Sequence, residues 1–177
     1  MSSTAKKHRS ESPNRVTFSI ITCSSSKYEA KIKGKKVDDP SGDLIEKILK
    51  NNGHVVHNRS LISDDKIGIR NSIKDALSDD NIDSIITTGG TGISPSDITI
   101  ESVRIFLSKD IPGFGELFRK ISYEMIGSAA MITRAIAGIA QEKPIFCLPG
   151  SSNAVEIAMV NLIIPEIGHI VKHAKEI

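Results

Sequence analysis

Apolar and polar positions alternate in blocks along the chain, with short apolar runs separated by longer amphipathic stretches. The short runs are rich in β-branched residues, which predicts buried strands at residues 16–23, 54–62, 82–88 and 143–148. In the longer stretches apolar residues recur with the period of a helix. The predicted helices cover residues 43–53, 64–81, 98–110, 114–129 and 152–177, the last of them broken at Pro165 or Gly168. Residues 24–42 are polar and lack a period, so we expect an exposed, functional loop there.

This order of elements predicts the fold class. Strands that alternate with helices through short loops form right-handed crossovers, which give an α/β fold with a mostly parallel central sheet and helices on both faces. Ligands bind such sheets outside the carboxyl ends of the strands. Polar loops follow Cys23, Thr88 and Leu148. We expect these loops to meet at that edge and to form the ligand site.

Length and composition narrow the class of protein. A chain of 177 residues can fold as one domain, which we assign to residues 15–177, after a polar, flexible N-terminal tail at residues 1–14. A net charge of +2, with 4% aromatic residues and no Trp, argues against a nucleic-acid-binding surface. No apolar stretch is long enough for a membrane span and the N-terminus has no signal-peptide core, so we expect a cytoplasmic protein without membrane contact. Cys23 and Cys147 end apolar runs, which is typical of buried, inert thiols.

Residues 87–97 read TTGGTGISPSD and follow the third predicted strand directly. The stretch has neither the Lys-Ser/Thr ending of a Walker loop nor the spacing of a Rossmann fingerprint. Glycines nevertheless allow positive φ angles and let backbone N–H groups approach an anion closely, and a helix that starts near Ser96 to Thr99 adds its positive end. If Ser96 or Thr99 caps that helix, Asp97 is left exposed in its first turn. The alternative is a tight turn in which Asp97 only serves the helix dipole.

A second pair of acidic residues follows the second predicted strand, where residues 61–65 read LISDD. Asp64 and Asp65 should therefore reach the same edge of the sheet as Asp97. Two carboxylates beside a phosphate-sized glycine loop favour a Mg²⁺ ion that keeps most of its waters. The alternative is that Asp64 and Asp65 only begin the next helix. The two interpretations are compatible, since Asp65 alone can cap the helix.

Other candidate residues carry weaker signals. LPGSSNAVEIA at residues 148–158 is another strand–turn–helix passage suited to an anion or a heterocycle, and Glu116 of DIPGFGELF either caps a helix or faces a ligand. His169 and His173 have the helical spacing of a metal-binding pair, but without a third ligand nearby a solvated helix end is favoured. The lysines that follow the first strand are either solvated or steer a polyanion towards the sheet edge.

In this order, the segments TTGGTGISPSDIT, LISDD, PGFGELFRKIS and LPGSSNAVEIA resemble the MogA/MoaB family of molybdenum cofactor biosynthesis proteins. The resemblance runs from about Val16 to the C-terminal helices. AIAGIAQEKPIFCLPGS and the length of the chain are closer to MoaB than to the longer MogA chains. The resemblance implies a three-layer α/β/α sandwich, Rossmann-like, that binds molybdopterin. It also implies a homotrimer, or a homohexamer built from trimers, and a separate molybdate-insertion enzyme as a candidate partner.

Active members of this family transfer AMP from Mg-ATP to the terminal phosphate of molybdopterin and release pyrophosphate. The resemblance implies that Asp64 and Asp97 are catalytic and hold Mg²⁺, directly or through water. It places residues that bind the pterin or the nucleotide at Ser24, Asp39, Ser41, Gly42, Thr88, Gly89, Gly90, Thr91, Gly92, Glu116, Pro149, Gly150 and Ser151.

This chain departs from the family pattern in the first loop. Family members often follow the first-loop serine with Asp or Asn and then Arg, whereas this chain reads SSSK, so Lys27 replaces the arginine in part. Some MoaB-type relatives lack the first aspartate; this chain has both, which favours an active molybdopterin adenylyltransferase. Its nucleophile, a phosphate monoester, is already ionised at neutral pH, so no general base is needed. The alternatives are a molybdopterin carrier or scaffold without a transfer step, and a related domain that inserts molybdate or cleaves a nucleotide pyrophosphate.

Overall fold

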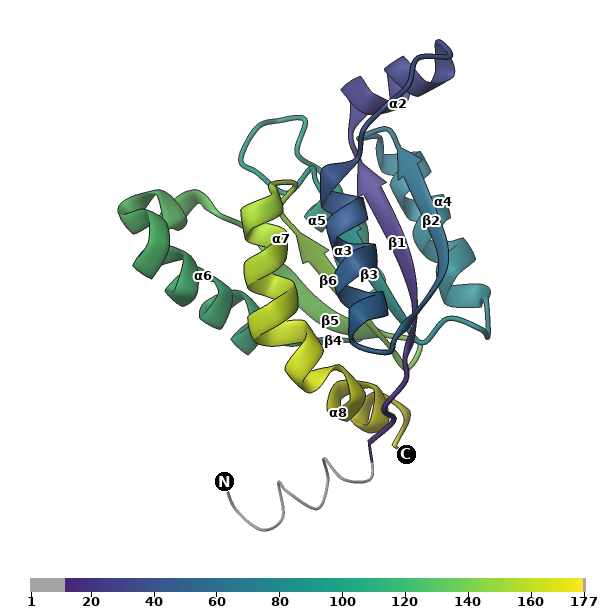
Figure 1. Ribbon diagram of the computed structural model, residues 1–177, viewed down its shortest axis with the longest axis vertical. Helices are drawn as coiled ribbons and strands as arrows, with labels where there is room; N and C mark the ends of the chain where they lie inside the picture. Colours follow the sequence, from purple (N-terminus) through teal and green to yellow (C-terminus); the bar gives the residue numbers. More distant parts are fainter. Residues whose placement is uncertain (1–11, 177) are drawn as a thin grey trace.

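A six-stranded sheet in the order β2-β1-β3-β6-β5-β4 runs through the centre of the molecule (Figure 1). The structure is a computed structural model that describes residues 12–176, so most of the predicted N-terminal tail lies outside the described residues. β1, β2, β3 and β6 are parallel, whereas β5 pairs antiparallel with both β6 and β4. The strands are β1 Thr17–Cys23, β2 Val55–Ile62, β3 Ser84–Thr88, β4 Lys109–Asp110, β5 Ile136–Ala140 and β6 Lys143–Leu148.

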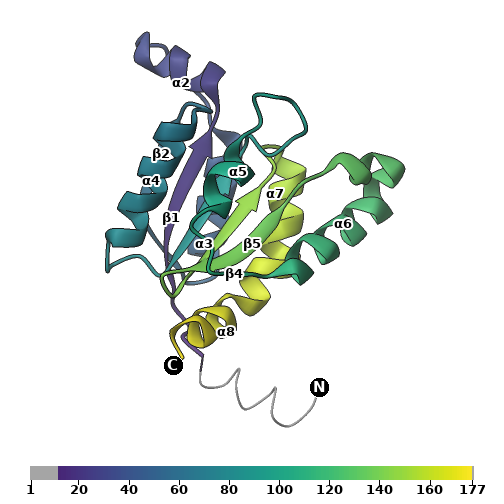
Figure 2. The same cartoon turned by 180° about the vertical axis from the view of Figure 1, so that it is seen from behind.

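Helices cover both faces of the sheet, which confirms the predicted three-layer α/β/α fold. α3, α6, α7 and α8 pack on one face (Figure 1), and α4 and α5 pack on the other, as the reverse view in Figure 2 shows. The helices are α3 Pro40–Asn51, α4 Lys66–Ser78, α5 Thr99–Arg104, α6 Pro112–Ile126, α7 Ser152–Ala158 and α8 Ile164–Lys175.

Side chains that alternate along each strand supply two separate cores. On β1, Phe18 and Ile20 enter the core that α3 covers, whereas Ile21 and Cys23 enter the core that α4 covers. Successive residues of a strand point to opposite faces of a sheet, so a strand that is buried on both faces is apolar throughout. This is why the central strands were predictable as continuous apolar runs.

All four predicted strands are confirmed, but the sequence analysis missed the two antiparallel strands. β5 has the sequence IAGIA, in which small residues give no β-branched signal, and it meets β6 after a tight turn at Gln141 and Glu142, both at positive φ. β4 is only two residues long and lies within the helix predicted for residues 98–110. That helix ends at Arg104, so the second half of the prediction was wrong.

The polar segment between β1 and α3, predicted as a loop, contains an additional helix, α2, at Ser25–Ile32. None of its side chains is buried, so the segment lacks the apolar period that would reveal a helix. α2 extends away from the body of the molecule beside the end of β1 (Figure 1). α3 then begins at Pro40 rather than at Asp43, with Asp39 as its N-cap.

The predicted break at Pro165 or Gly168 is wrong, because the C-terminal segment is helical throughout. A π-helical turn at Met159–Ile163 joins α7 to α8, and Pro165 lies in the first turn of α8, where a missing N–H is tolerated. By length and composition alone, Ser152–Lys175 is long and apolar enough to cross a membrane. Its apolar side chains, including Val155, Ile163 and Ile167, instead belong to the core that α3 covers, which makes it weak evidence for a membrane span.

Lys143, at the start of β6, is almost fully buried, and its ammonium group caps the C-terminal end of α4. Its Nζ donates hydrogen bonds to the carbonyl oxygens of Leu77 and Asp79, at 2.8 and 2.7 Å, and of Ala76 at 3.4 Å. Carbonyl groups at the end of a helix have no partner within the helix. The lysine is therefore a partner for the carbonyl groups of Ala76 and Leu77, whereas the Asp79 carbonyl also accepts from Ile82 N at 3.0 Å.

We predict that Lys143→Met lowers the free energy of unfolding by about 1–3 kcal/mol, because it removes the lysine partner of the Ala76 and Leu77 carbonyl groups. Lys74→Met, on the exposed side of α4, is the matched control and should change stability by less than about 0.5 kcal/mol. Urea denaturation of both variants measures the difference. Equal stabilities for the two variants would contradict a structural role for Lys143.

Candidate ligand-binding site

A pocket of about 260 Å³ opens at the carboxyl ends of β1, β3 and β6. The loops that follow these three strands all contribute to its lining, which confirms the predicted meeting of the three loops. Its lining residues are Thr22, Cys23, Ser24, Lys27, Ser41, Asp64, Thr88, Gly89, Gly90 and Gly150. Seven of these were predicted as site residues from the sequence: Ser24, Ser41, Asp64, Thr88, Gly89, Gly90 and Gly150.

Two glycines with positive φ angles form the floor of the pocket. Gly89 has φ +95° and Gly90 has φ +61°. A Cβ on Gly89 would collide with the carbonyl oxygen of Cys23, so another side chain is excluded there for steric as well as conformational reasons. Gly89 N–H donates to Leu148 O at 3.0 Å, and the Thr88 hydroxyl donates to Pro149 O, also at 3.0 Å. These bonds fix the glycine loop to the loop after β6.

Asp64 lies at the end of β2 and holds the start of α2. Its Oδ2 accepts hydrogen bonds from Ser25 N at 2.8 Å and from the Ser25 hydroxyl at 3.2 Å. Its Oδ1 is buried beside Gly90 and has no hydrogen-bond partner in the protein. Asp65 caps α4 by accepting from Gly68 N at 2.7 Å. The two aspartates therefore have different roles, and Asp64 is available to a ligand, as the sequence allowed.

Thr99 lies next to this pocket, and the sequence analysis considered it only as a helix cap. It is fully buried, and apart from a contact with the Cys23 thiol its Oγ1 has no hydrogen-bond partner. An added Cβ on Gly90 would collide with both Thr99 Oγ1 and Asp64 Oδ1, so the two oxygens lie against the same glycine. Arg70 Nε, Thr87 Oγ1 and Ser102 Oγ are also buried without a partner among the described residues. The two oxygens at Gly90 differ from these in lying together, which makes this a candidate position for a ligand, an ion or a water.

Asp97 has a different environment from the one predicted. Neither Ser96 nor Thr99 caps α5, whose N-cap is Ile98. Asp97 is half-buried rather than exposed, because the loop folds back on itself and Asp97 Oδ2 accepts from Ser94 N at 2.9 Å. The same carboxylate lies against Gly92. Asp97 therefore shapes the outer part of the glycine loop and does not line the pocket, and its role as a Mg²⁺ ligand stays a prediction.

Arg134 supports this outer part of the loop from behind. Its Nε donates to Thr91 O at 2.8 Å, and its guanidinium also contacts Asp97 O at 3.3 Å and forms an ion pair with Glu101 at 2.6 Å. Thr91, predicted as a ligand residue, is itself buried. The sequence offers no signal for Arg134, because a single arginine before β5 becomes informative only when the fold places it beneath the loop.

A partly buried ion pair between Asp39 and Arg59 contacts two residues that line the pocket, Thr22 and Lys27. Asp39 accepts from the Thr22 hydroxyl at 2.7 Å, from Arg59 Nη2 at 2.8 Å and from Gly42 N at 3.2 Å. Burial by itself raises the pKa of Asp39, but the bonds from Arg59, Thr22 and Gly42 outweigh it, and the pKa lies below its ordinary value. Lys27 reaches the same carboxylate at 3.7 Å and lines the pocket.

The remaining predicted residues divide between the pocket and its surroundings. The Ser41 hydroxyl donates to Gly150 O at 2.6 Å, which connects α3 to the loop after β6. Ser151 caps α7 by accepting from Ala154 N at 3.3 Å and does not line the pocket. Burial raises the pKa of the Cys23 thiol to about 12, so this pocket residue is protonated and is not a nucleophile.

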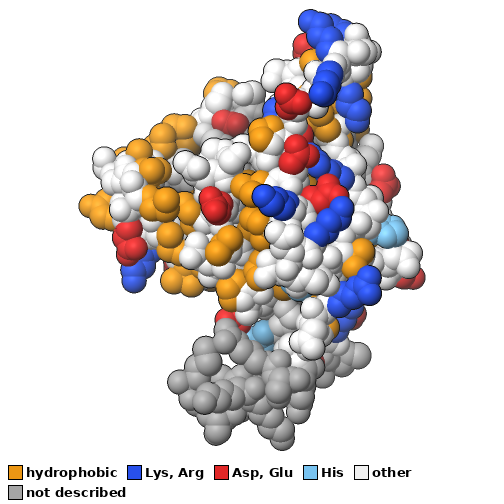
Figure 3. All heavy atoms as spheres, in the orientation of Figure 1, with side chains coloured by type: hydrophobic (Ala, Val, Ile, Leu, Met, Phe, Trp, Pro, Cys, Tyr) orange, Lys and Arg blue, Asp and Glu red, His pale blue; other side chains and the backbone are white. Residues whose placement is uncertain are grey.

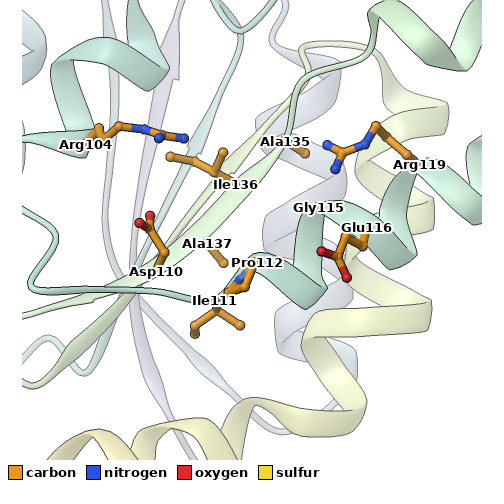
Figure 4. A pocket seen from close by; sticks show the side chains of 10 residues that line it. All are labelled: Arg104, Asp110, Ile111, Pro112, Gly115, Glu116, Arg119, Ala135, Ile136 and Ala137. Atoms are coloured by element: carbon orange, nitrogen blue, oxygen red, sulfur yellow. The ribbon is translucent and has the colours of Figure 1, made fainter.

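Glu116 lies in a separate hollow of about 280 Å³ between α5, β5 and the start of α6. In Figure 4, Arg104 and Arg119 reach towards each other from opposite sides of this hollow, with Ile136 between them. Glu116 points outward from α6 and Asp110 lies across the hollow. The structure therefore does not bring Glu116 into the pocket beside the glycine loop, and its predicted contact with a ligand stays a prediction.

The fold and the pocket define an α/β protein with a glycine-rich loop at the carboxyl ends of parallel strands. The Probable molybdopterin binding domain family matches residues 19–169. Molybdenum cofactor biosynthesis protein B of Bacillus cereus is 44% identical over 164 residues, which cover 92% of this chain and 93% of that protein. The chain therefore belongs to the MogA/MoaB family of molybdopterin-binding proteins, on its MoaB side, and its process is molybdenum cofactor biosynthesis.

Two further relatives agree with this placement. A protein of Methanocaldococcus jannaschii named probable molybdopterin adenylyltransferase is 40% identical over 161 residues, covering 91% of this chain and 95% of its own length. The crystal structure of the tungsten cofactor synthesizing protein MoaB from Pyrococcus furiosus matches with a TM-score of 0.81 and 40% identity, covering 93% of this chain and 99% of that one. The fold is thus that of the MoaB proteins across the whole described chain.

We predict that Asp39→Asn lowers the free energy of unfolding at pH 7 by about 1.5–3 kcal/mol, the range for a hydrogen bond to a charged group. Because the folded-state pKa is lowered, the contribution of Asp39 is complete above its ordinary pKa of 3.8 and is lost as the pH falls from there through the folded pKa. The difference between wild type and variant should therefore stay constant from about pH 7 to 5 and shrink below 3.8.

Asp43→Asn is the control for this prediction, because Asp43 also contacts Arg59, at 2.6 Å, but is mostly exposed. Its effect at pH 7 should stay below about 1 kcal/mol. Urea denaturation across this pH range measures both variants. A pH-independent difference for Asp39→Asn would show that the charge of Asp39 is not the source of the lost stability.

Proposed function

We propose that this protein is a molybdopterin adenylyltransferase that transfers AMP from Mg-ATP to the terminal phosphate of molybdopterin. A phosphate oxygen of molybdopterin attacks the α-phosphorus of ATP, the bond from that phosphorus to the bridging oxygen breaks, and pyrophosphate leaves with the electron pair. The name of the Methanocaldococcus relative supports this activity. The observation that carries it is the buried, unpartnered Oδ1 of Asp64 beside Gly90.

The pocket suits a reaction between two polyanions. Gly89 and Gly90 bring backbone groups close to the ligand without a side chain in between, and Lys27 contributes a positive charge at the mouth. The attacking phosphate is ionised at neutral pH, so the site needs no general base, and the inert Cys23 thiol is consistent with this. Positioning and charge neutralisation are then the main tasks of the protein, as in other phosphoryl-group transfers.

The residues present fit a Mg²⁺ ion that is held mainly by its substrates. Asp64 Oδ1 is a hard oxygen donor without a partner, and Thr99 Oγ1 lies against the same glycine, Gly90. Among the described residues no group of three or more His, Cys, Asp or Glu side chains is arranged to hold a metal ion. Mg²⁺ commonly binds through one or two carboxylates together with substrate phosphates and water. When bound, the ion neutralises charge on the phosphates of ATP.

We predict that Asp64→Ala lowers the rate of adenylylation by about 10²–10³-fold, the loss typical for one group that stabilises developing charge. Asp97→Ala should also lower the rate, because the outer glycine loop loses its bond to Ser94. Asp65→Asn is the control, since Asp65 caps α4 and does not line the pocket. The measurement is the formation of adenylylated pterin from purified protein, molybdopterin, Mg²⁺ and ATP.

Each result of this assay has a distinct meaning. Product from wild type and from Asp65→Asn, but not from Asp64→Ala, supports the enzyme and the role of Asp64. An unchanged rate for Asp64→Ala would refute that role while leaving the enzyme in place. Tight binding of molybdopterin without product from wild type would refute the transferase and favour a carrier.

We also propose that the protein self-associates through an apolar surface formed by α6 and the following 3₁₀ turn, Gly127–Ile132. Figure 3 shows hydrophobic side chains gathered on this side of the molecule. Met131 is 83% exposed and Met125 62% exposed. The other large hydrophobic residues exposed there are Leu117, Tyr123, Ile126 and Ile132. A monomer seldom leaves so many large apolar side chains together in water, and a second copy of the chain is the occupant that the family resemblance implies.

We predict that the double variant Met125→Ser, Met131→Ser elutes as a smaller species than wild type, because it removes two of the most exposed apolar side chains of this surface. Size-exclusion chromatography with light scattering gives the molar mass of each. Ile67→Ser is the control, since Ile67 is 74% exposed but lies on α4, on the other side of the sheet. A monomeric wild type would contradict the proposal.

A further inference from the structure

Two histidines of α8 contact each other at the end of the molecule opposite the ligand pocket. His169 and His173 lie one helical turn apart, and their Nε2 atoms are 2.9 Å from each other. Figures 1 and 2 both place α8 at the opposite end of the sheet from α2, which starts beside the pocket. The function proposed above uses neither histidine, so their arrangement requires a separate explanation.

The other ring nitrogen of each histidine faces a glutamate. His173 Nδ1 is 2.7 Å from Glu176 Oε2, and His169 Nδ1 is 3.3 Å from Glu166 Oε2. A carboxylate accepts a hydrogen bond, so each Nδ1 that contacts one carries a proton. Each glutamate therefore fixes its histidine in the tautomer whose Nε2 has a lone pair. The two Nε2 atoms contact each other with the rings in a T-shaped arrangement, their centroids 4.6 Å apart.

We propose that His169 and His173 form a binding site for a divalent transition-metal ion of the Zn²⁺, Ni²⁺ or Cu²⁺ type. Metal-binding histidines commonly donate their second ring N–H to a carboxylate, which orients the ring and strengthens the ligand. Both histidines have that arrangement before any metal binds. Imidazole nitrogen suits these metals, whereas Mg²⁺ prefers oxygen ligands. The site is therefore chemically distinct from the pocket around Asp64.

The geometry needs only a small adjustment. Two nitrogen ligands of a tetrahedral Zn²⁺ ion, each about 2.05 Å from the metal, lie about 3.3 Å apart, compared with 2.9 Å between the two Nε2 atoms here. Rotation of either imidazole ring within the turn provides this difference. The side chains of His169 and His173 are 33% and 46% exposed and line a hollow of about 490 Å³, which leaves room for water as the remaining ligands.

Binding also displaces a proton. The 2.9 Å contact between the two Nε2 atoms is a hydrogen bond only when one of them carries a proton. A metal ion bound to both Nε2 atoms takes the place of that proton, whereas the Nδ1 protons stay on the histidines and are donated to the glutamates. Metal binding to a protonated ligand releases its proton.

The test is a calorimetric titration of metal-free, full-length protein with Zn²⁺ in the presence of excess Mg²⁺, which occupies oxygen-rich sites. The titration is repeated in two buffers with different ionisation enthalpies, so that released protons are counted. We expect one Zn²⁺ per chain, with release of up to one proton. His173→Gln should abolish this binding, and Glu176→Gln should weaken it about 10–100-fold, the usual effect of removing a carboxylate behind a histidine ligand.

His57→Gln is the matched control, because His57 also contacts a carboxylate, Asp79 at 3.0 Å, but lies on β2 without a second histidine. Zn²⁺ binding should survive this substitution. Thermal unfolding gives an independent measure, since a metal that binds the folded protein raises Tm in wild type and not in His173→Gln. Undiminished Zn²⁺ binding by His173→Gln, or no Zn²⁺ binding by wild type, would overturn the proposal.

Discussion

The ligand pocket depends on how closely the backbone at Gly89 approaches the carbonyl oxygen of Cys23. The contact leaves no space for a Cβ, and the positive φ of Gly89 turns the chain across the end of β1. The same residue donates its N–H to Leu148 at the end of β6. One residue thus joins the carboxyl ends of three parallel strands. Parallel pairing brings these ends to one edge, but the glycine determines that their loops enclose a pocket instead of spreading apart.

Around this contact the protein keeps polar atoms buried without partners. Asp64 Oδ1 and Thr99 Oγ1 both lie against Gly90, and neither has a hydrogen-bond partner apart from the contact of Thr99 with the Cys23 thiol. A buried, unsatisfied oxygen costs about 1–3 kcal/mol of stability. Nearby polar groups are, by contrast, well satisfied: Asp39 has three hydrogen-bond donors, and Arg134 binds the loop backbone. Arg70 Nε, Thr87 Oγ1 and Ser102 Oγ are also buried without a partner among the described residues, so the two oxygens at Gly90 are distinguished by lying together beside one glycine of the pocket. The groups that support the pocket are fixed by the protein itself.

Much of this arrangement follows from the sequence, because central parallel strands are buried on both faces. Phe18 to Cys23 and Ser84 to Thr88 could be assigned to strands from their apolar and β-branched residues, and strand direction then placed Asp64 at the right edge. α2 could not be predicted because none of its side chains is buried. β5 has only small residues beside its isoleucines.

The side-chain contacts within the site could not be predicted from the sequence either. Thr99 and Arg134 matter through their positions in space, since Thr99 lies with Asp64 against Gly90 and Arg134 reaches from the residues before β5 to the glycine loop. Asp97 was placed in the correct loop but in the wrong environment, because its bond to Ser94 depends on how the loop folds back. The pairing of His169 with His173 was visible as a spacing, whereas the glutamates that orient both rings became evident only from side-chain positions.

The exposed helix α2 couples the folding of its own segment to ligand contact at Asp64. No side chain of α2 is buried, so this segment can open without disturbing either core. Its first residue, Ser25, occupies Asp64 Oδ2, while Oδ1 stays open. A ligand that contacts Oδ1 alone leaves α2 folded, whereas a ligand that takes both oxygens must compete with Ser25 and favours the open segment. The amide exchange rates of α2 thus become a readout of how Asp64 is engaged, even though the helix lies outside both cores.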